Sequence, residues 1–187
     1  YKRQHIRNLH KYDSVLLIGC GSAYIAATIG RLWMEESGIR AHAEIASEWN
    51  YRISSESKNT LAIFVSQSGE TADTLLALEK AKKMGLHTLA IVNKANSTIA
   101  KKADEVILLD IGIEQSVAST KAFTTQLAKL FSLATQQPIP QRLYELAQQA
   151  INVDITFLVS ELVHASKIMI LGKNVMSVSY THLRAHE

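Results

Sequence analysis

Short apolar runs alternate with helix-patterned segments over residues 14–135, and this alternation constrains the fold more than any other feature of the chain. Five runs are rich in apolar residues and read as strands. They are residues 14–18, 41–46, 61–65, 87–92 and 106–109. Strands that alternate with helices at this spacing form a parallel sheet with right-handed crossovers and helices on both faces. The sequence therefore predicts an α/β fold, a three-layer αβα sandwich around a five-stranded parallel sheet.

The segment SQSGET, residues 66–71, stands where the third run ends and the helix-patterned residues 72–84 begin. The first N–H groups of a helix have no partner within the helix, and the helix dipole adds partial positive charge, so an anion binds readily there. Gly69 allows the backbone to approach a ligand closely. Four side chains of the segment are neutral donors: Ser66, Gln67, Ser68 and Thr71. We interpret the segment as a phosphate-binding site.

A simpler interpretation of the same segment is an ordinary helix N-cap. Ser68 would cap the helix, while Glu70 and Asp73 would lie favourably in its first turn. Capping needs one hydroxyl and the segment has four polar groups, which favours ligand binding. At about 1 kcal/mol net per neutral hydrogen bond, and roughly 2 when the acceptor is charged, four to six donors would bind phosphate with micromolar to millimolar affinity.

The first strand ends in a second glycine-containing turn, GCGSA at residues 19–23. Two glycines after a strand form half of a dinucleotide-binding fingerprint, but Tyr24 is too bulky for the close helix packing that the fingerprint needs. Glu44 lies within the second strand rather than at its end, so no nucleotide cofactor is expected. Two interpretations stay open: a turn without a ligand, or a second part of the phosphate site, because Ser22 and Ser66 both fall at the carboxyl edge of the sheet.

Cys20 is the single cysteine of the chain, which excludes an internal disulfide and fits a reducing compartment. No histidine and acid stand at a spacing typical of nucleophilic catalysis, so we interpret Cys20 as a small buried thiol. His182 and His186 have the i, i+4 spacing of metal ligands, but they belong to an aberrant tail described below. The sequence predicts neither a metal site nor a cofactor.

Composition narrows the classes of partner. The 187 residues carry a formal net charge of +3, and at most two lysines or arginines are adjacent, so neither nucleic acid nor an anionic membrane finds a concentrated basic patch. No apolar stretch approaches the roughly 20 residues of a membrane span. The first residues lack Met and an apolar signal core. We therefore expect a cytoplasmic chain whose first residue lies within a longer protein.

The pattern divides the chain into four parts. Residues 1–12 are predicted to be the end of a linker helix, and residues 13–137 to be the α/β domain. Residues 138–177 are predicted to contain a connecting helix, over 141–165, and the first strand of a second, truncated domain. Residues 178–187 continue no earlier pattern and resemble an in-frame translation of a transposase sequencing adapter, so no function is assigned to them.

Four segments, in this order and at suitable spacing, resemble the first sugar-isomerase (SIS) domain of the glucosamine-6-phosphate synthase family, the glutamine:fructose-6-phosphate aminotransferases. They are CGS at 20–22, EIASEWNYR at 44–52, SQSGETADT at 66–74 and VASTKAFTTQ at 117–126. The resemblance runs from about residue 13 to 137 and implies a flavodoxin-like SIS fold. Any one segment alone would indicate only the wider sugar-isomerase superfamily.

The resemblance also implies a set of substrate-binding residues. A sugar phosphate would bind Ser22, Ser66, Gln67, Ser68 and Thr71, and its carbon chain would contact Val117 and Ser119. Two positions depart from the commonest family pattern. Ala23 stands where the family has a serine, which removes one phosphate hydroxyl and leaves Ser22 as the hydroxyl of that turn, and Ser116 replaces a glycine.

The reaction implied by the resemblance converts fructose 6-phosphate and glutamine into glucosamine 6-phosphate and glutamate. In the family, an N-terminal amidotransferase domain releases the ammonia, and the base, lysine and histidine of the isomerase come from the second SIS domain and a neighbouring subunit. We therefore expect no catalytic residue in this chain, an inactive isolated chain, and a homo-oligomer, a dimer, in the intact protein. The alternative is the phosphosugar-binding SIS module of a regulator or of another phosphosugar isomerase or deaminase.

Overall fold

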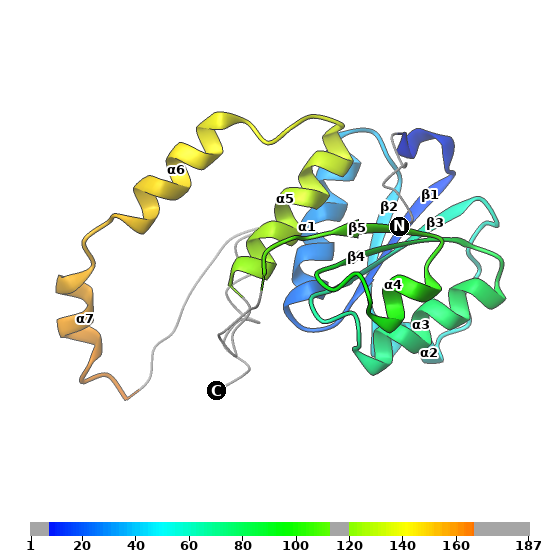
Figure 1. Ribbon diagram of the computed structural model, residues 1–187, viewed down its shortest axis with the longest axis horizontal. Helices are drawn as coiled ribbons and strands as arrows, with labels where there is room; N and C mark the ends of the chain where they lie inside the picture. The colour runs from blue at the N-terminus through cyan, green and yellow to red at the C-terminus, as the bar shows by residue number, and fades with distance from the viewer. Residues whose placement is uncertain (1–7, 113–119, 167–187) are drawn as a thin grey trace.

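The computed structural model describes residues 8–112 and 120–166 of the chain (Figure 1). The described part begins with a short 3₁₀ helix, Leu9–Lys11, at the predicted end of the linker helix. The predicted strand of a second domain, the tail at 178–187, and Val117 and Ser119 lie outside the described residues.

Five parallel strands form one sheet in the order β2-β1-β3-β4-β5, which confirms the predicted sheet (Figure 1). The strands are β1 Ser14–Gly19, β2 Ala41–Ile45, β3 Thr60–Ser66, β4 His87–Val92 and β5 Glu105–Leu108. Each bound lies within one residue of the prediction. The order reverses direction between β1 and β3, because β1 connects to β2 on one side and β3 connects to β4 on the other.

Helices cover both faces of the sheet, as the sequence predicts. They are α1 Ser22–Glu36, α2 Ala46–Tyr51, α3 Ala72–Lys83, α4 Thr98–Lys102 and α5 Lys121–Thr135. The helices α1 and α5 pack together on one face, while α2, α3 and α4 cover the other (Figure 1). Within residues 8–112 and 120–166, no helix combines the length and the apolar character that a membrane span needs.

Strands β1 and β3 are buried on both faces, which is why their sequences are largely apolar. Alternate side chains enter different cores: Leu17 belongs to the core under α1 and α5, whereas Leu16 belongs to the core under α2 and α3. Phe64 of β3 is fully buried in the second core together with Trp49 of α2. The sheet therefore holds the loops at its carboxyl edge on two packed layers.

The chain continues beyond α5 as two separate helices, α6 Gln141–Ile151 and α7 Thr156–Leu162. The prediction of one helix over 141–165 is therefore wrong. The N–H of Asn152 closes α6 onto its last carbonyls, and Asp154 Oδ1 accepts hydrogen bonds from the N–H of Thr156, at 2.9 Å, and from its hydroxyl, at 2.6 Å. Such local side-chain bonds compete with the helix and explain the break.

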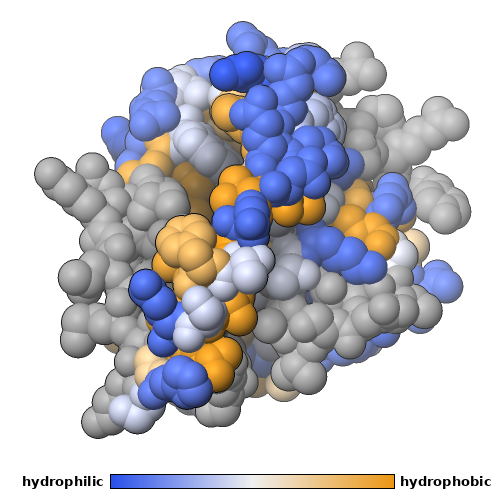
Figure 2. Space-filling view, turned by 90° about the vertical axis from the view of Figure 1, so that its left-hand side faces the viewer, coloured by the Kyte–Doolittle hydropathy of each residue, from blue (hydrophilic) through white to orange (hydrophobic). Residues whose placement is uncertain are grey.

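Neither α6 nor α7 contains a buried residue. Apolar side chains such as Tyr144, Ile151 and Phe157 are exposed on them. Figure 2 views the molecule from the side of these helices and shows apolar atoms in the open there. The amphipathic pattern of the sequence is thus present, but its apolar stripe has no packing partner in the described residues.

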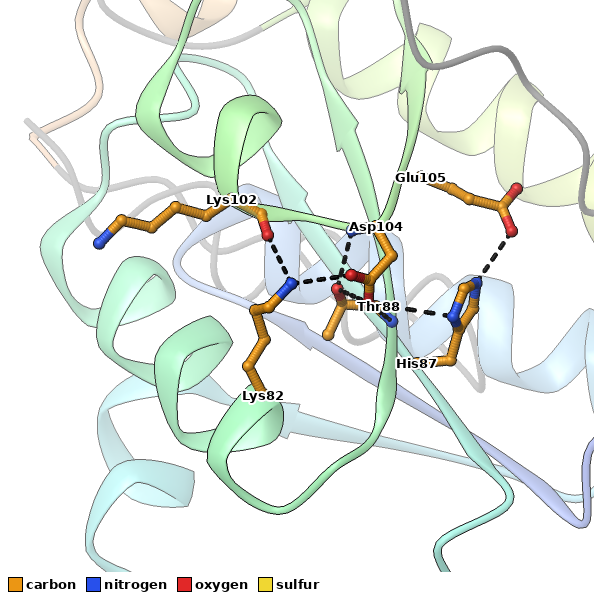
Figure 3. Close-up of polar contacts among 6 residues, drawn as sticks. All are labelled: Lys82, His87, Thr88, Lys102, Asp104 and Glu105. Carbon is orange, nitrogen blue, oxygen red and sulfur yellow. Dashed lines mark hydrogen bonds and ion pairs between the residues drawn. The ribbon is translucent and has the colours of Figure 1, made fainter.

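Asp104 ties together three elements at the amino edge of the sheet (Figure 3). Its carboxylate accepts hydrogen bonds from Lys82 Nζ at 2.8 Å, from the Thr88 hydroxyl at 2.7 Å and from the Thr88 N–H at 2.9 Å. Partial burial raises the pKa of Asp104, but the bonds from Lys82 and Thr88 outweigh it and lower the pKa to about 2. This cluster stabilises the fold on the side opposite the predicted phosphate site.

Asp104→Asn is expected to lower the free energy of unfolding by about 1 kcal/mol at pH 7, a value reduced because about a third of the side chain is exposed. The folded carboxyl has a lower pKa than the unfolded one, so its stabilisation is present above pH 4 and is lost as the pH falls toward 2. Urea unfolding of both proteins between pH 7 and pH 3 measures this difference. If the loss of stability in Asp104→Asn were the same at every pH, the stabilisation could not be assigned to the ionised carboxylate of Asp104.

Candidate functional site

The segment 66–71 lies at the carboxyl edge of the sheet, between the end of β3 and the start of α3. The turn at 19–23 lies beside it, because β1 and β3 are neighbours in the sheet. The N-termini of α1 and α3 therefore reach this edge from opposite faces. This is the place where the strand order reverses, and ligands of open α/β sheets bind in the crevice at such a point.

Ser66 stabilises the turn at 66–71 through hydrogen bonds of its buried side chain. Its side chain is buried, its Oγ accepts a hydrogen bond from the Gly69 N–H at 3.1 Å, and it lies 3.1 Å from the hydroxyl oxygen of Thr71. The side chains of Gln67, Ser68 and Thr71 are half-buried. The structure thus brings the four predicted donors of 66–71 into one turn.

The start of α3 lacks a side-chain cap. The N-cap residue is Thr71, whose side chain makes no capping bond, and Ser68 Oγ accepts from the Glu70 N–H at 3.1 Å instead. The interpretation of Ser68 as the N-cap is therefore wrong: helix α3 begins at Ala72, one turn later than that role requires. Among the described residues, no group accepts a hydrogen bond from the N–H of Ala72, Asp73 or Thr74.

The start of α4 is different, because residues of the segment 66–71 accept hydrogen bonds from its first N–H groups. Glu70 Oε1 accepts from the Thr98 N–H at 2.8 Å, and the Gly69 carbonyl accepts from the Ile99 N–H at 3.1 Å. Ser97, the N-cap residue, accepts from the Ala100 N–H. The first N–H groups of α4 therefore have hydrogen-bond acceptors, whereas the first N–H groups of α3 have none among the described residues.

Gly69 has a left-handed backbone, with φ of +68°. A Cβ at this position would lie 2.2 Å from the Oγ of Ser97, a buried residue. The sequence interpretation assigned Gly69 to close contact with a ligand, but in the structure it is Ser97 that occupies the space. Glycine is needed here for the backbone angle and for the contact between the loop and α4.

Ser22 is the first residue of α1 and is half-buried. Its N-cap is Gly21, with φ of +55°, and no side chain caps the helix. The N–H groups of Ala23 and Tyr24 bond to the carbonyls of Cys20 and Gly21, so this helix end offers fewer donors than α3 does. Ala23 is buried in the core, consistent with its apolar side chain.

Cys20 links the two turns of the site. The Thr74 hydroxyl donates to its Sγ at 3.7 Å, and the thiol is half-buried. Thr74 itself is fully buried in α3. The interpretation of Cys20 as a buried thiol is therefore wrong in its burial. Its contact with Thr74 holds the β1–α1 turn against the first turn of α3.

Electrostatics at this edge come from backbone dipoles and two carboxylates, Glu70 and Asp73, the second in the first turn of α3. The backbone and side-chain hydrogen bonds from Thr98 lower the pKa of Glu70, and the nearby Lys101 and Lys94 lower it further. No lysine or arginine side chain of the described residues bonds to the four donors of 66–71. The arrangement suits an anion held by neutral donors and helix N-termini.

Sequence reasoning missed Asn93, which hydrogen-bonds both to the segment 66–71 and to the residues after β5. Its N–H donates to the Gln67 carbonyl at 3.1 Å, its Nδ2 donates to the Gly112 carbonyl at 2.7 Å, and its Oδ1 accepts from the Ile111 N–H at 3.2 Å. A signal was present, since Asn93 directly follows β4 at the same edge of the sheet. Val117 and Ser119, the other predicted contacts, lie outside the described residues.

The chain is similar in sequence to several aminotransferases. A 207-position alignment with glutamine--fructose-6-phosphate aminotransferase [isomerizing] of Legionella pneumophila (strain Lens) is 39% identical, covering 97% of this chain and 33% of the relative. The Brucella abortus protein of the same name is 48% identical over 125 residues, which are 66% of this chain and 21% of the relative. The chain thus spans about a third or less of the length of these relatives.

Two solved structures share the fold. The C-terminal domain of glucosamine-fructose-6-phosphate aminotransferase from Francisella tularensis is 34% identical, with a TM-score of 0.65, over 77% of this chain and 43% of that one. Glucosamine-6-phosphate deaminase from Thermotoga maritima is 31% identical, with a TM-score of 0.66, over 78% and 47%. The sequence model of the SIS domain matches residues 8–136. Both the matched residues and the parallel sheet with its flanking helices show that the chain belongs to the SIS domain family.

Proposed function

We propose that the chain binds the phosphate of a six-carbon sugar phosphate in the crevice between the carboxyl ends of β1 and β3. The proposed contacts combine the donors of both turns with the segment that precedes α5. They are Ser22, Ser66, Gln67, Ser68, Thr71, Val117 and Ser119.

The observation that carries this proposal is the uncapped N-terminus of α3. Three consecutive N–H groups, those of Ala72, Asp73 and Thr74, donate to no acceptor among the described residues, while the neighbouring helix α4 is fully capped. Uncapped N–H groups at a helix start bind anions, and the dipole of a twelve-residue helix adds to the attraction. Hydroxyls that flank these groups supply the remaining hydrogen bonds to phosphate oxygens.

We propose fructose 6-phosphate or glucosamine 6-phosphate as the ligand. The support is the similarity to aminotransferases whose names contain fructose 6-phosphate. In this proposal the chain supplies the sugar-phosphate site of an enzyme that converts fructose 6-phosphate and glutamine into glucosamine 6-phosphate and glutamate, and the intact protein is a dimer. Its catalytic groups are proposed to lie outside this chain, so the chain alone is expected to release no glucosamine 6-phosphate.

A second candidate is the SIS part of a phosphosugar deaminase, which the likeness to the Thermotoga maritima enzyme favours. Both candidates use the same phosphate site, and they differ in whether glutamine donates the nitrogen. The coding sequence upstream of residue 1 separates them. A glutaminase domain beginning with Met-Cys supports the synthase, and a different domain in that place contradicts it.

Fructose 6-phosphate is expected to raise the melting temperature of the chain by roughly 5 °C at one hundred times its Kd, whereas fructose has no effect. The difference arises because the proposed donors act on the phosphate. Ser68→Ala removes one half-buried donor and is expected to weaken the response, while Ser160→Ala, on the surface of α7, serves as the matched control. Equal responses to the two sugars would contradict the proposed function.

A further inference from the structure

The side chain of Glu70 bonds to the start of α4, although Glu70 belongs to the same six-residue segment as the donors of the site. We propose that Glu70 is a positioning residue for the sugar-phosphate site: by capping α4 it holds residues 67–70 in the conformation that leaves the N-terminus of α3 open. This proposal rests on the proposed function. It assigns Glu70 no contact with the ligand.

Three bonds fasten the loop to the structure beside it. Glu70 Oε1 accepts from the Thr98 N–H at 2.8 Å, the Gly69 carbonyl accepts from the Ile99 N–H at 3.1 Å, and the Gln67 carbonyl accepts from the Asn93 N–H at 3.1 Å. Of these, only the bond from Glu70 is made by a side chain and involves a charge. Charge-assisted hydrogen bonds are roughly twice as strong as neutral ones, so Glu70 is the strongest single tie.

The loop packs tightly against Ser97 at the start of α4. Gly69 approaches Ser97 so closely that even a Cβ would overlap its side chain, and Ser97 is buried. The loop therefore rests directly on the first turn of α4. Because Glu70 precedes the N-cap of α3 by one residue, its attachment fixes the direction in which α3 begins.

Charge alone predicts the opposite role for this residue. A carboxylate near an anion site repels the anion, so removing Glu70 would strengthen phosphate binding if its effect were only Coulombic. Lys94 and Lys101 interact with Glu70 through their charges and partly offset its charge. The two explanations thus differ in the sign of the expected change, which makes them separable.

Four variants of the full chain separate them. Glu70→Ala removes the cap, whereas Glu70→Gln removes the charge but keeps an oxygen that accepts from the Thr98 N–H. Thr98→Pro removes the donor itself, because Thr98 is the first residue of α4, where proline fits and Ser97 already has an extended backbone with ψ of 158°. Thr98→Ser keeps both the N–H and the hydroxyl and is its control.

The dissociation constant of fructose 6-phosphate, measured by calorimetry, is expected to rise about tenfold in Glu70→Ala and in Thr98→Pro. Glu70→Gln keeps only a neutral hydrogen bond and is expected to weaken binding less than Glu70→Ala does, while Thr98→Ser is expected to stay within about twofold of the wild type. The double variant Glu70→Ala/Thr98→Pro is expected to bind no more weakly than either single variant, because both remove the same bond. Wild-type or tighter binding by Glu70→Ala, or additive losses in the double variant, would overturn the proposal.

Hydrogen exchange separates this inference from the proposed function. Without ligand, the amides of Gly69 and Glu70 are expected to exchange at least several-fold faster in Glu70→Ala and Thr98→Pro than in the wild type. Unchanged exchange overturns the positioning role even when the wild type binds. If the wild type binds no fructose 6-phosphate, the proposed function fails, and the role of Glu70 in binding fails with it.

Discussion

Gly69→Ala is expected to destabilise the chain by about 3 kcal/mol and to abolish binding of fructose 6-phosphate. Alanine at a φ of +68° costs about 1–2 kcal/mol, and its Cβ would overlap both Oγ and Cβ of Ser97, at 2.2 and 2.5 Å. The loop can relieve this overlap only by moving off α4, which displaces the start of α3. Urea unfolding measures the stability, and calorimetry measures the binding.

Two controls divide this effect into its parts. Gly85→Ala places alanine at a similar φ, +77°, where a Cβ meets nothing within 4 Å, so it reports the backbone cost alone. Gly69→Ala/Ser97→Gly removes the overlapping side chain at little cost to the N-cap, and it is expected to recover most of the lost stability and part of the binding. If Gly69→Ala loses no more stability than Gly85→Ala, the contact between the loop and α4 is not the cause.

Gly19→Ala is expected to be of similar severity, with a loss of about 3 kcal/mol and a weakened response to fructose 6-phosphate. A Cβ on Gly19 would lie 2.8 Å from the carbonyl carbon of Ala23 and 2.9 Å from the nitrogen of Tyr24. These are backbone atoms of the first turn of α1, so no side-chain truncation relieves the overlap. Helix α1 and Ser22 would have to move away from β1.

Gly38→Ala, just beyond the C-terminal end of α1, is the control for this prediction, because a Cβ there meets nothing within 4 Å. Its cost comes from a φ of +75° and is expected to be about 1–2 kcal/mol. Both variants are compared with the wild type by urea unfolding and by thermal shift with fructose 6-phosphate. A Gly19→Ala protein as stable as Gly38→Ala would show that the turn is not tightly packed against α1.

The sheet could be predicted from the sequence because its physical cause is local. Strands such as residues 14–18 and 87–92 are buried on both faces, and that burial leaves largely apolar runs whose ends lie within one residue of the observed strand ends. The break between α6 and α7 was missed for the opposite reason. Apolar spacing continues through it, and the hydrogen bonds that Asp154 accepts from Thr156 interrupt the helix without interrupting the pattern.

The site was predicted in its residue types but not in its contacts. Neutral donors after a strand identify 66–71, since a strand end and a helix start are visible in the sequence. Whether Thr71 or Ser68 is the N-cap of α3 depends on the path of the loop before that helix. Contacts of Gly69 and Glu70 with α4 set this path, and α4 begins almost thirty residues later in the sequence. Asn93 was missed for the same reason, because its partners are distant in sequence.

An amide NMR titration of the ¹⁵N-labelled chain with fructose 6-phosphate tests the central claim most directly. If the phosphate binds where proposed, saturable shifts appear at the amides of Ala72, Asp73 and Thr74 and in the turn at Ser22. The capped amides of Thr98 and Ile99 shift less, because their hydrogen bonds to the loop persist. A saturable titration that leaves the start of α3 unchanged, or no titration at all, would contradict the claim.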